Sequence, residues 1–224
     1  MLKYLSVSNR KTSFLCTVGC MALFSGVLGA EESISQKSTP VDYKIGPTLE
    51  AKVGYFFFVD STMRDVYDEG GLDLQISGSY PVIKWARRYA LNVYASVEYL
   101  QRTGTSLSGN QNTSIWEIPV NVGLKPVIAI TNEFQYYFAV GPRYFYIHQH
   151  YNSEYLPKNN HRNGIGLFVN TGFNFIFWRH LLVDVFGEYS YAQTKFHASS
   201  DPLTYTKTTQ VGGFTFGGGL GYSF

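Results

Sequence analysis

Cysteine is nearly absent from this 224-residue chain, which contains only Cys16 and Cys20. Both lie in an amino-terminal segment that we expect to be removed, so the mature chain would contain none. A chain without cysteine has no disulfides, no thiolate metal sites and no cysteine nucleophile. Any chemistry of the processed protein must therefore come from other side chains.

Charged residues are also scarce and nearly balanced. They make up 15% of the chain, and the formal net charge is +2. Without Lys3, Arg10 and Lys11 of the amino-terminal segment, 15 basic residues face 16 acidic ones. A near-neutral chain lacks the basic surface that binds a phosphate backbone, so we expect no nucleic-acid partner.

Long apolar runs are limited to residues 14–30, which follow a basic start and precede Glu31 and Glu32. A basic start, an apolar stretch and a small-residue exit are typical of a secretory signal peptide, with cleavage here after Ala30. Two alternatives remain open. The stretch is at the lower length limit for a membrane-spanning helix, and the residues around Cys20 loosely resemble a lipidation site.

Aromatic residues, by contrast, are abundant at 17% of the chain, and they recur with period two. A β-strand places successive side chains on opposite faces, so alternation of apolar and polar residues predicts strands. Eight segments show it: 46–59, 71–80, 88–100, 114–125, 133–147, 164–177, 181–196 and 208–224.

Eight charged residues of these segments fall on the face opposite the aliphatic one. They are Glu50, Lys52, Asp73, Glu98, Glu117, Arg143, Asp184 and Glu188. Lys or Arg on a lipid-facing position at mid-bilayer costs about 2–4 kcal/mol, so strands that face lipid should exclude charge from that face. A soluble antiparallel sheet shows the same alternation with the exposure reversed. The amino-terminal segment and the carboxy-terminal sequence favour the membrane.

The carboxy-terminal segment ends on Phe224, with Tyr222 and Leu220 on the same face and small residues on the other. This resembles the closing strand of bacterial outer-membrane β-barrels, whose terminal Phe is the family's assembly signal. The resemblance implies an all-β fold, a transmembrane antiparallel up-and-down β-barrel in the bacterial outer membrane with both termini periplasmic. It also implies contact with outer-membrane lipid and lipopolysaccharide, and recognition of Phe224, Tyr222 and Leu220 by the barrel assembly machinery.

The connections between the predicted strands alternate in length, as expected of eight strands in such a barrel. Segments 60–70, 101–113, 148–163 and 197–207 are long, whereas 81–87, 126–132 and 178–180 are shorter. Ten strands would result if 81–87 or 126–132 contained further pairing. We expect a signal peptide over 1–30, a short periplasmic extension over 31–45 and one barrel domain over 46–224.

The interior of an eight-stranded barrel is just wide enough for side chains to fill or for one small ligand. Buried carboxylates need partners or water, so we expect Lys52 and Arg143 each to bridge several of the six inward acids. The favoured interpretation is a structural ion network that plugs the lumen. The alternative is a narrow, gated, cation-preferring pore.

Four inward aromatic residues, Phe56, Phe58, Phe145 and Phe168, are predicted near the outer ends of their strands. They would fill a wide rim or form a hydrophobic vestibule. The second arrangement is the one implied by a resemblance to OmpW-like barrels in size and loop pattern. That family is associated with passage or binding of small hydrophobic compounds.

Three functions follow from the barrel prediction. The favoured one is a structural or surface-interaction barrel of the OmpA/OmpX kind, whose polar loops suit an extracellular partner. An OmpW-like conduit for small hydrophobic ligands is the second, and a lipid-modifying hydrolase is the third.

The hydrolase alternative lacks its catalytic pair. In the lipid A deacylase family, a His and a Ser lie two residues apart on a strand, whereas here His161 is followed two residues later by Asn163. His150 and Ser153 are three apart in an expected loop, which fixes no geometry for a nucleophile and its base. We therefore expect no enzyme and no cofactor.

Histidines of the segment 148–163 offer a metal-binding alternative. His148, His150 and His161 all lie in this segment. Because histidines in exposed loops are usually solvated, the sequence predicts no metal site here.

Overall fold

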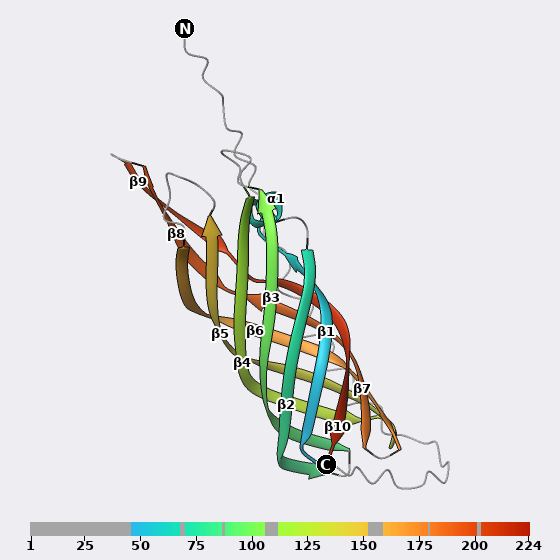
Figure 1. The fold of residues 1–224 in the computed structure, drawn as a ribbon. Coiled ribbons are helices and arrows are strands. Elements are labelled where there is room, and N and C mark those ends of the chain that lie inside the picture. The colour runs from blue at the N-terminus through green and yellow to red at the C-terminus, as the bar shows by residue number, and fades with distance from the viewer. Residues whose placement is uncertain are drawn as a thin grey trace. The chain divides into compact units, whose positions relative to one another are not determined.

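A computed structural model describes residues 46–67, 70–86, 88–105, 112–151, 159–178, 180–200 and 203–224. Eight strands form a closed antiparallel barrel in the order β1-β10-β7-β6-β5-β4-β3-β2 (Figure 1). They are β1 (Thr48–Phe58), β2 (Gly70–Ala86), β3 (Tyr89–Thr105), β4 (Asn112–Ala129), β5 (Phe134–Tyr151), β6 (Asn159–Phe177), β7 (Leu181–Tyr191) and β10 (Gly213–Ser223). The predicted eight-stranded up-and-down barrel is confirmed. The expected signal peptide over 1–30 and the extension over 31–45 lie outside the described residues.

The strands are longer than the sequence pattern indicates. β2 to β6 have 17 to 19 residues each, whereas about 9–11 residues suffice to cross a bilayer. The predicted links 81–87 and 126–132 are mostly strand, since Ala86 pairs with Tyr89 and Ala129 pairs with Gln135. This pairing lengthens existing strands, so the ten-stranded alternative is wrong for the barrel.

Two of the predicted long loops contain elements that are not barrel strands. Segment 197–207 belongs largely to a separate hairpin of β8 (Gln193–Ser200) and β9 (Leu203–Gln210), which continues from β7 and β10 (Figure 1). Segment 60–70 contains the helix α1 (Ser61–Tyr67). We call the end of the barrel with α1 and this hairpin the loop end. The turn end is the other, where the carboxy terminus lies (Figure 1).

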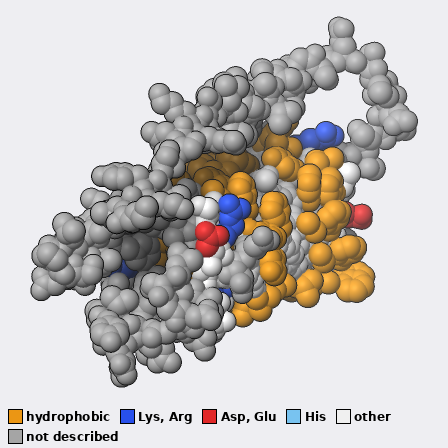
Figure 2. Space-filling model, turned by 90° about the horizontal axis from the view of Figure 1, so that it is seen from above, with side chains coloured by type: hydrophobic (Ala, Val, Ile, Leu, Met, Phe, Trp, Pro, Cys, Tyr) orange, Lys and Arg blue, Asp and Glu red, His pale blue; other side chains and the backbone are white. Residues whose placement is uncertain are grey.

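The outer surface of the barrel is apolar. Along β1 exposed and buried residues alternate strictly from Glu50 to Phe58, and Figure 2 shows hydrophobic side chains gathered over the described outer surface. Side chains such as Val53, Ile76 and Leu220 are 49%, 64% and 61% exposed. Soluble proteins rarely expose so continuous an apolar surface, so this is the outer face of a membrane-spanning barrel. In the described ranges, no helix is both long and apolar enough to cross a membrane.

Helix α1 covers the lumen at the loop end. Its first turn is capped by Asp60, whose Oδ1 accepts a hydrogen bond from the Met63 amide at 3.3 Å, as helix amino termini require. The helix backbone lies close to β3 at Gly104, where a Cβ would collide with the carbonyl oxygen of Val66. Glycine at this position therefore lets the helix seat against the barrel wall.

Candidate functional site

All eight charged side chains predicted to face inward lie in the lumen and are buried. None of them is more than 4% exposed. They are Glu50, Lys52, Asp73, Glu98, Glu117, Arg143, Asp184 and Glu188. The structure brings six of them into two ion-pair clusters and leaves Asp73 and Glu117 outside both.

The first cluster lies toward the turn end and is centred on Lys52. Its Nζ is 2.5 Å from Asp184 Oδ2 and 2.9 Å from Glu50 Oε2. Lys125 Nζ lies 3.2 Å from the other oxygen of Glu50 and 4.1 Å from the centre of the Tyr137 ring. The Tyr137 hydroxyl donates to Asp184 Oδ2 at 3.0 Å. Two ammonium groups and two carboxylates therefore neutralise one another here.

Glycines of β10 make room for this cluster. Gly219 pairs with Lys52 and Gly221 with Glu50. A Cβ at either glycine would lie 2.7 Å from the Cγ atom of the charged residue opposite it, closer than real side chains approach. The two glycines on the inward face of β10 therefore leave room for the side chains of Glu50 and Lys52.

The second cluster is centred on Arg143 in the middle of the lumen. Its guanidinium contacts both carboxylate oxygens of Glu98, at 3.1 and 2.7 Å, and Glu188 Oε1 at 2.7 Å. Side-chain amides also donate hydrogen bonds to these carboxylates, among them Gln75 to Glu98 at 3.1 Å. Asn121 donates to Glu98 at 2.5 Å and Asn170 donates to Glu188 at 2.9 Å. As predicted for Lys52 and Arg143, each base bridges two acids.

Asp73 and Glu117 form no ion pair with any described base. Each has one carboxylate oxygen that is buried without a hydrogen bond. Arg102 is a further base with a buried side chain, and it was not predicted because residues 101–113 were assigned to a loop. β3 continues to Thr105, and Arg102 keeps the inward phase of Glu98; its Nη1 donates to the Leu72 carbonyl at 2.8 Å.

A hydrophobic cluster fills the loop end of the lumen. Three of the four predicted inward phenylalanines, Phe56, Phe58 and Phe145, are buried in it together with Met63 and Tyr67 of α1. Their rings and the helix side chains pack as a core, with Phe56 and Phe58 edge to face at 4.8 Å. In this structure the space proposed as a vestibule is occupied by the helix.

The prediction that Phe168 lies with the other three phenylalanines is wrong. Phe168 pairs with Gly141 and Ser190 in the interior of β6, and it packs in a separate cluster with Tyr94 and Ala139. The sequence placed the start of the sixth strand at residue 164, but β6 begins at Asn159. Residue 168 is therefore farther from the loop end than the sequence suggested.

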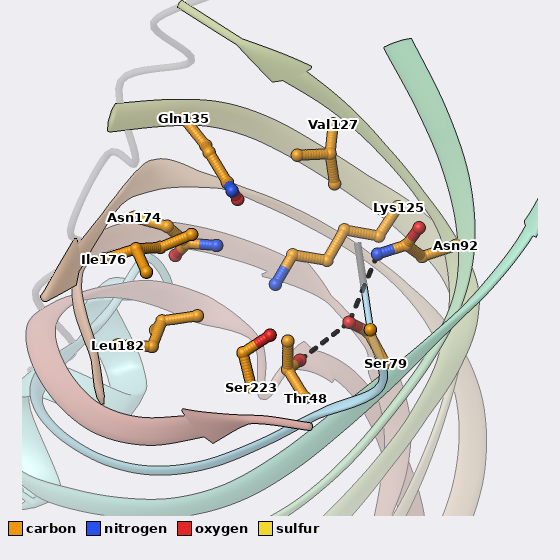
Figure 3. Close-up of a pocket in the computed structure, with 11 residues that line it drawn as sticks. Thr48, Ser79, Asn92, Lys125, Val127, Gln135, Asn174, Ile176, Leu182 and Ser223 are labelled. Atoms are coloured by element: carbon orange, nitrogen blue, oxygen red, sulfur yellow. Dashed lines mark hydrogen bonds between the residues drawn. The ribbon is translucent and has the colours of Figure 1, made fainter. Parts of the chain in front are cut away.

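A small pocket lies at the turn end, lined by residues of all eight barrel strands (Figure 3). The Lys125 side chain extends across it, and its wall includes a hydrogen-bonded row in which Ser79 contacts Thr48 at 2.8 Å and Asn92 at 3.3 Å. The Lys125 ammonium group pairs with Glu50 of the first ion-pair cluster, which lies on the loop-end side of the pocket. This pocket is therefore closed toward the loop end by charged side chains that are already paired.

Most of the predicted loop 148–163 is strand where the structure describes it. His148 on β5 lies opposite His161 on β6, and His150 lies opposite Asn159. Ser153 falls outside the described residues. Within the described ranges, no group of three or more His, Cys, Asp or Glu side chains is placed to hold a metal ion.

By sequence, the chain matches no protein-family model and no curated protein. By structure, it resembles the outer membrane protein OprG from Pseudomonas aeruginosa, with a TM-score of 0.59 and 17% identity over 83% of this chain and 99% of that one. It also resembles E. coli outer membrane protein W, with a TM-score of 0.51 and 12% identity over 80% and 98% of the two chains. For Neisserial surface protein A the values are 0.50 and 14%, over 80% and 97%. At these identities the likeness shows the fold, and the fold is that of the small eight-stranded outer-membrane β-barrels.

Proposed function

We propose that this protein is an integral outer-membrane barrel with a sealed lumen and a structural or surface-interaction role. The observation that carries the proposal is the filling of the lumen along its length. Two ion-pair clusters, around Lys52 and Arg143, occupy its turn end and middle. The hydrophobic cluster under α1 occupies the loop end.

The two ends of the barrel support a proposed orientation in the membrane. The turn end carries the carboxy terminus and the short connections, and we assign it to the periplasm, with both termini there. The loop end, with α1 and the β8–β9 hairpin, would then face outward, where an extracellular partner is reached. The apolar belt would contact outer-membrane lipid and lipopolysaccharide, and the closing strand would be read by the barrel assembly machinery.

We assign no catalytic role and no cofactor to this barrel. His148 of β5 and His161 of β6 contact each other and aromatic side chains: Tyr146 lies beside His161, and Trp116 stacks on His148. A hydrolase of the kind considered above would instead need a serine within hydrogen-bonding distance of its base.

Conductance in planar lipid bilayers tests the sealed lumen. The purified, refolded protein should give no steady single-channel current, because two ion-pair clusters and a hydrophobic cluster fill the lumen. Heat-modifiable migration on a gel would show that the inserted protein is folded. A steady current that changes in Lys52→Ala or Arg143→Ala would overturn the proposal and support the narrow-pore alternative.

One observation favours a second candidate, a binding site for a small hydrophobic compound. The apolar cluster that includes Phe58 and Phe145 is covered at the loop end by α1, a helix of 7 residues. Displacement of α1 would therefore expose this cluster. A hydrophobic fluorescent probe should then bind the folded barrel and be lost in Phe145→Asp. Binding that is equal in the wild type and this variant would exclude the cluster as the site.

A further inference from the structure

Three aromatic side chains form a row across the outward faces of β4, β5 and β6 near the loop end. Trp116 pairs with His148, and His148 pairs with His161. Directly opposite residues of antiparallel strands have Cβ atoms about 4.5–5.5 Å apart, so their side chains contact each other. The backbone ladder therefore holds two imidazoles side by side on a rigid sheet.

Two polar atoms, one from His148 and one from the neighbouring Tyr146, lie close to one ring nitrogen of His161. His161 Nδ1 lies 2.9 Å from His148 Nδ1 and 2.7 Å from the Tyr146 hydroxyl oxygen. Each of the two imidazole rings also stacks on a neighbouring aromatic ring. The Trp116 and His148 rings are 5.0 Å apart at 30°, and the Tyr146 and His161 rings are 5.9 Å apart at 27°.

Hydrogen bonding alone does not account well for this convergence. In a neutral imidazole, Nδ1 carries either one N–H or one lone pair. His161 Nδ1 therefore forms one good hydrogen bond, yet two polar atoms lie within 2.9 Å of it. In the tautomers with both Nδ1 atoms unprotonated, each of the three atoms presents a lone pair, and one cation would bind all three.

The spacing of the two nitrogens matches a metal site. Zinc–imidazole bonds are about 2.0–2.1 Å long, so two nitrogens bound to one ion at angles of about 90–110° lie about 2.9–3.4 Å apart. The observed separation of 2.9 Å falls at the lower limit of that range. Imidazole ligands select zinc, copper and nickel over the hard cations calcium and magnesium, which take oxygen ligands.

We propose that His148 and His161 bind a divalent transition-metal ion of the zinc, copper or nickel class on the outer face of the barrel. Tyr146 is the neighbouring hydroxyl that serves as a third ligand or hydrogen-bonds to the site, and Trp116 orients the His148 ring. The imidazole nitrogens bind as neutral lone-pair donors, and water completes the coordination. The proposal is independent of the sealed lumen, because these side chains point away from it.

The site lies where ions from the medium would reach it. On the same outward face of β6, Asn163 follows His161 before the apolar belt begins with Ile165 and Leu167. His161 is exposed, and His148 is half-buried beside it. The row therefore stands at the loop-end margin of the apolar belt, outside the hydrocarbon.

Copper quenching of tryptophan fluorescence tests the proposal, because Trp116 stacks directly on a proposed ligand. The protein is purified without a histidine tag, kept folded in detergent micelles and titrated with Cu²⁺. A saturable quench with one ion per protein is expected, and Zn²⁺, which does not quench, should reverse it by competition. Absence of a saturable quench that zinc reverses would overturn the proposal.

Variants locate the ion. His148→Ala and His161→Ala should each lose the saturable quench, and Tyr146→Phe should weaken binding about tenfold, as removal of a supporting group does. Trp116→Phe should lose the quench, because it removes the fluorophore that stacks on His148. His180→Ala is the matched control, since His180 lies at the turn end against Tyr222, and it should bind as the wild type does.

Heat-modifiable migration of every variant verifies that it is folded. Unchanged copper binding in folded His148→Ala and His161→Ala would overturn the assignment. So would a loss confined to His180→Ala, because the ion would then lie at the opposite end of the barrel.

Discussion

Arg143 and Glu98 face each other across the lumen in a two-pronged ion pair, with Nη1–Oε1 and Nη2–Oε2 distances of 3.1 and 2.7 Å. The two residues lie on β5 and β3, which are separated by β4 in the barrel. Glu188 on β7 accepts from the same guanidinium at 2.7 Å. One arginine therefore ties together carboxylates from strands on both sides of its own.

Removing this arginine should destabilise the barrel strongly. In Arg143→Ala two buried carboxylates lose their cation, and breaking a buried pair in this way typically costs about 3–5 kcal/mol. The measurement is the free energy of unfolding in urea, with the protein refolded in lipid vesicles. Lys84→Ala is the control, because Lys84 is exposed near the turn end and surface substitutions usually change stability by about 0.5 kcal/mol or less. An Arg143→Ala variant as stable as Lys84→Ala would show that the cluster contributes nothing to folding.

The faces of the strands were predictable from the sequence because lipid imposes one rule on every strand. Lipid-facing positions must be apolar whatever their neighbours are, so period-two alternation identifies Lys52 and Asp184 as inward residues without knowledge of the fold. Their pairing across the barrel was only partly predictable. The pairing depends on the strand register and on the space left by Gly219 and Gly221. The alternation in the sequence identifies these two positions as small, but it does not show which side chains lie opposite them.

The ends of the strands were not predictable in the same way. Beyond the hydrocarbon, water solvates either face, so the alternation loses its meaning while the backbone pairing continues. This is why Arg102 and His161 were assigned to loops and why Phe168 was placed too close to the rim. The helix α1 is too short for a periodic signal, and it is fixed by contacts of Met63 and Tyr67 with phenylalanines that precede it in the chain.

The packing of α1 on the loop-end hydrophobic cluster should depend on Met63. This side chain is 4% exposed and packs in the loop-end cluster, so Met63→Ala leaves a cavity and should cost about 2–5 kcal/mol of unfolding free energy. Arg64→Ala, at the adjacent exposed position of the same helix, should change stability by about 0.5 kcal/mol or less. Urea titration of the two variants makes the comparison. Equal stability would mean that the helix does not pack on the lumen in the membrane.

The apolar belt should reject charge most strongly at its middle. Val53 lies midway along β1, opposite Leu74 and Gly218, whereas Leu49 on the same face lies near the turn end opposite Tyr222. Arg at the bilayer midplane costs about 2–4 kcal/mol but about 0–1 kcal/mol near the interface. Unfolding from lipid vesicles should therefore show Val53→Arg to be far less stable than Leu49→Arg. The reverse order would place the membrane midplane elsewhere on the barrel.

Deletion of Phe224 should impair assembly in cells much more than stability in vitro. The residue is 64% exposed, its amide donates to the Pro47 carbonyl at 3.0 Å, and its ring lies 5.0 Å from that of Tyr222. One backbone hydrogen bond and one exposed ring pair together contribute about 1–2 kcal/mol. The refolded variant should therefore unfold at only slightly lower urea concentration than the wild type, because the pairing of β10 with β1 and β7 remains.

In cells the same deletion removes the residue that we propose the assembly machinery recognises, so the yield in the outer membrane should fall sharply. Phe214→Ala is the matched control, since it removes an exposed aromatic ring from the other end of the same strand. Its outer-membrane yield should stay near that of the wild type. If deletion of Phe224 and Phe214→Ala reduce the yield equally, the effect belongs to the stability of β10, and Phe224 is not a recognition signal.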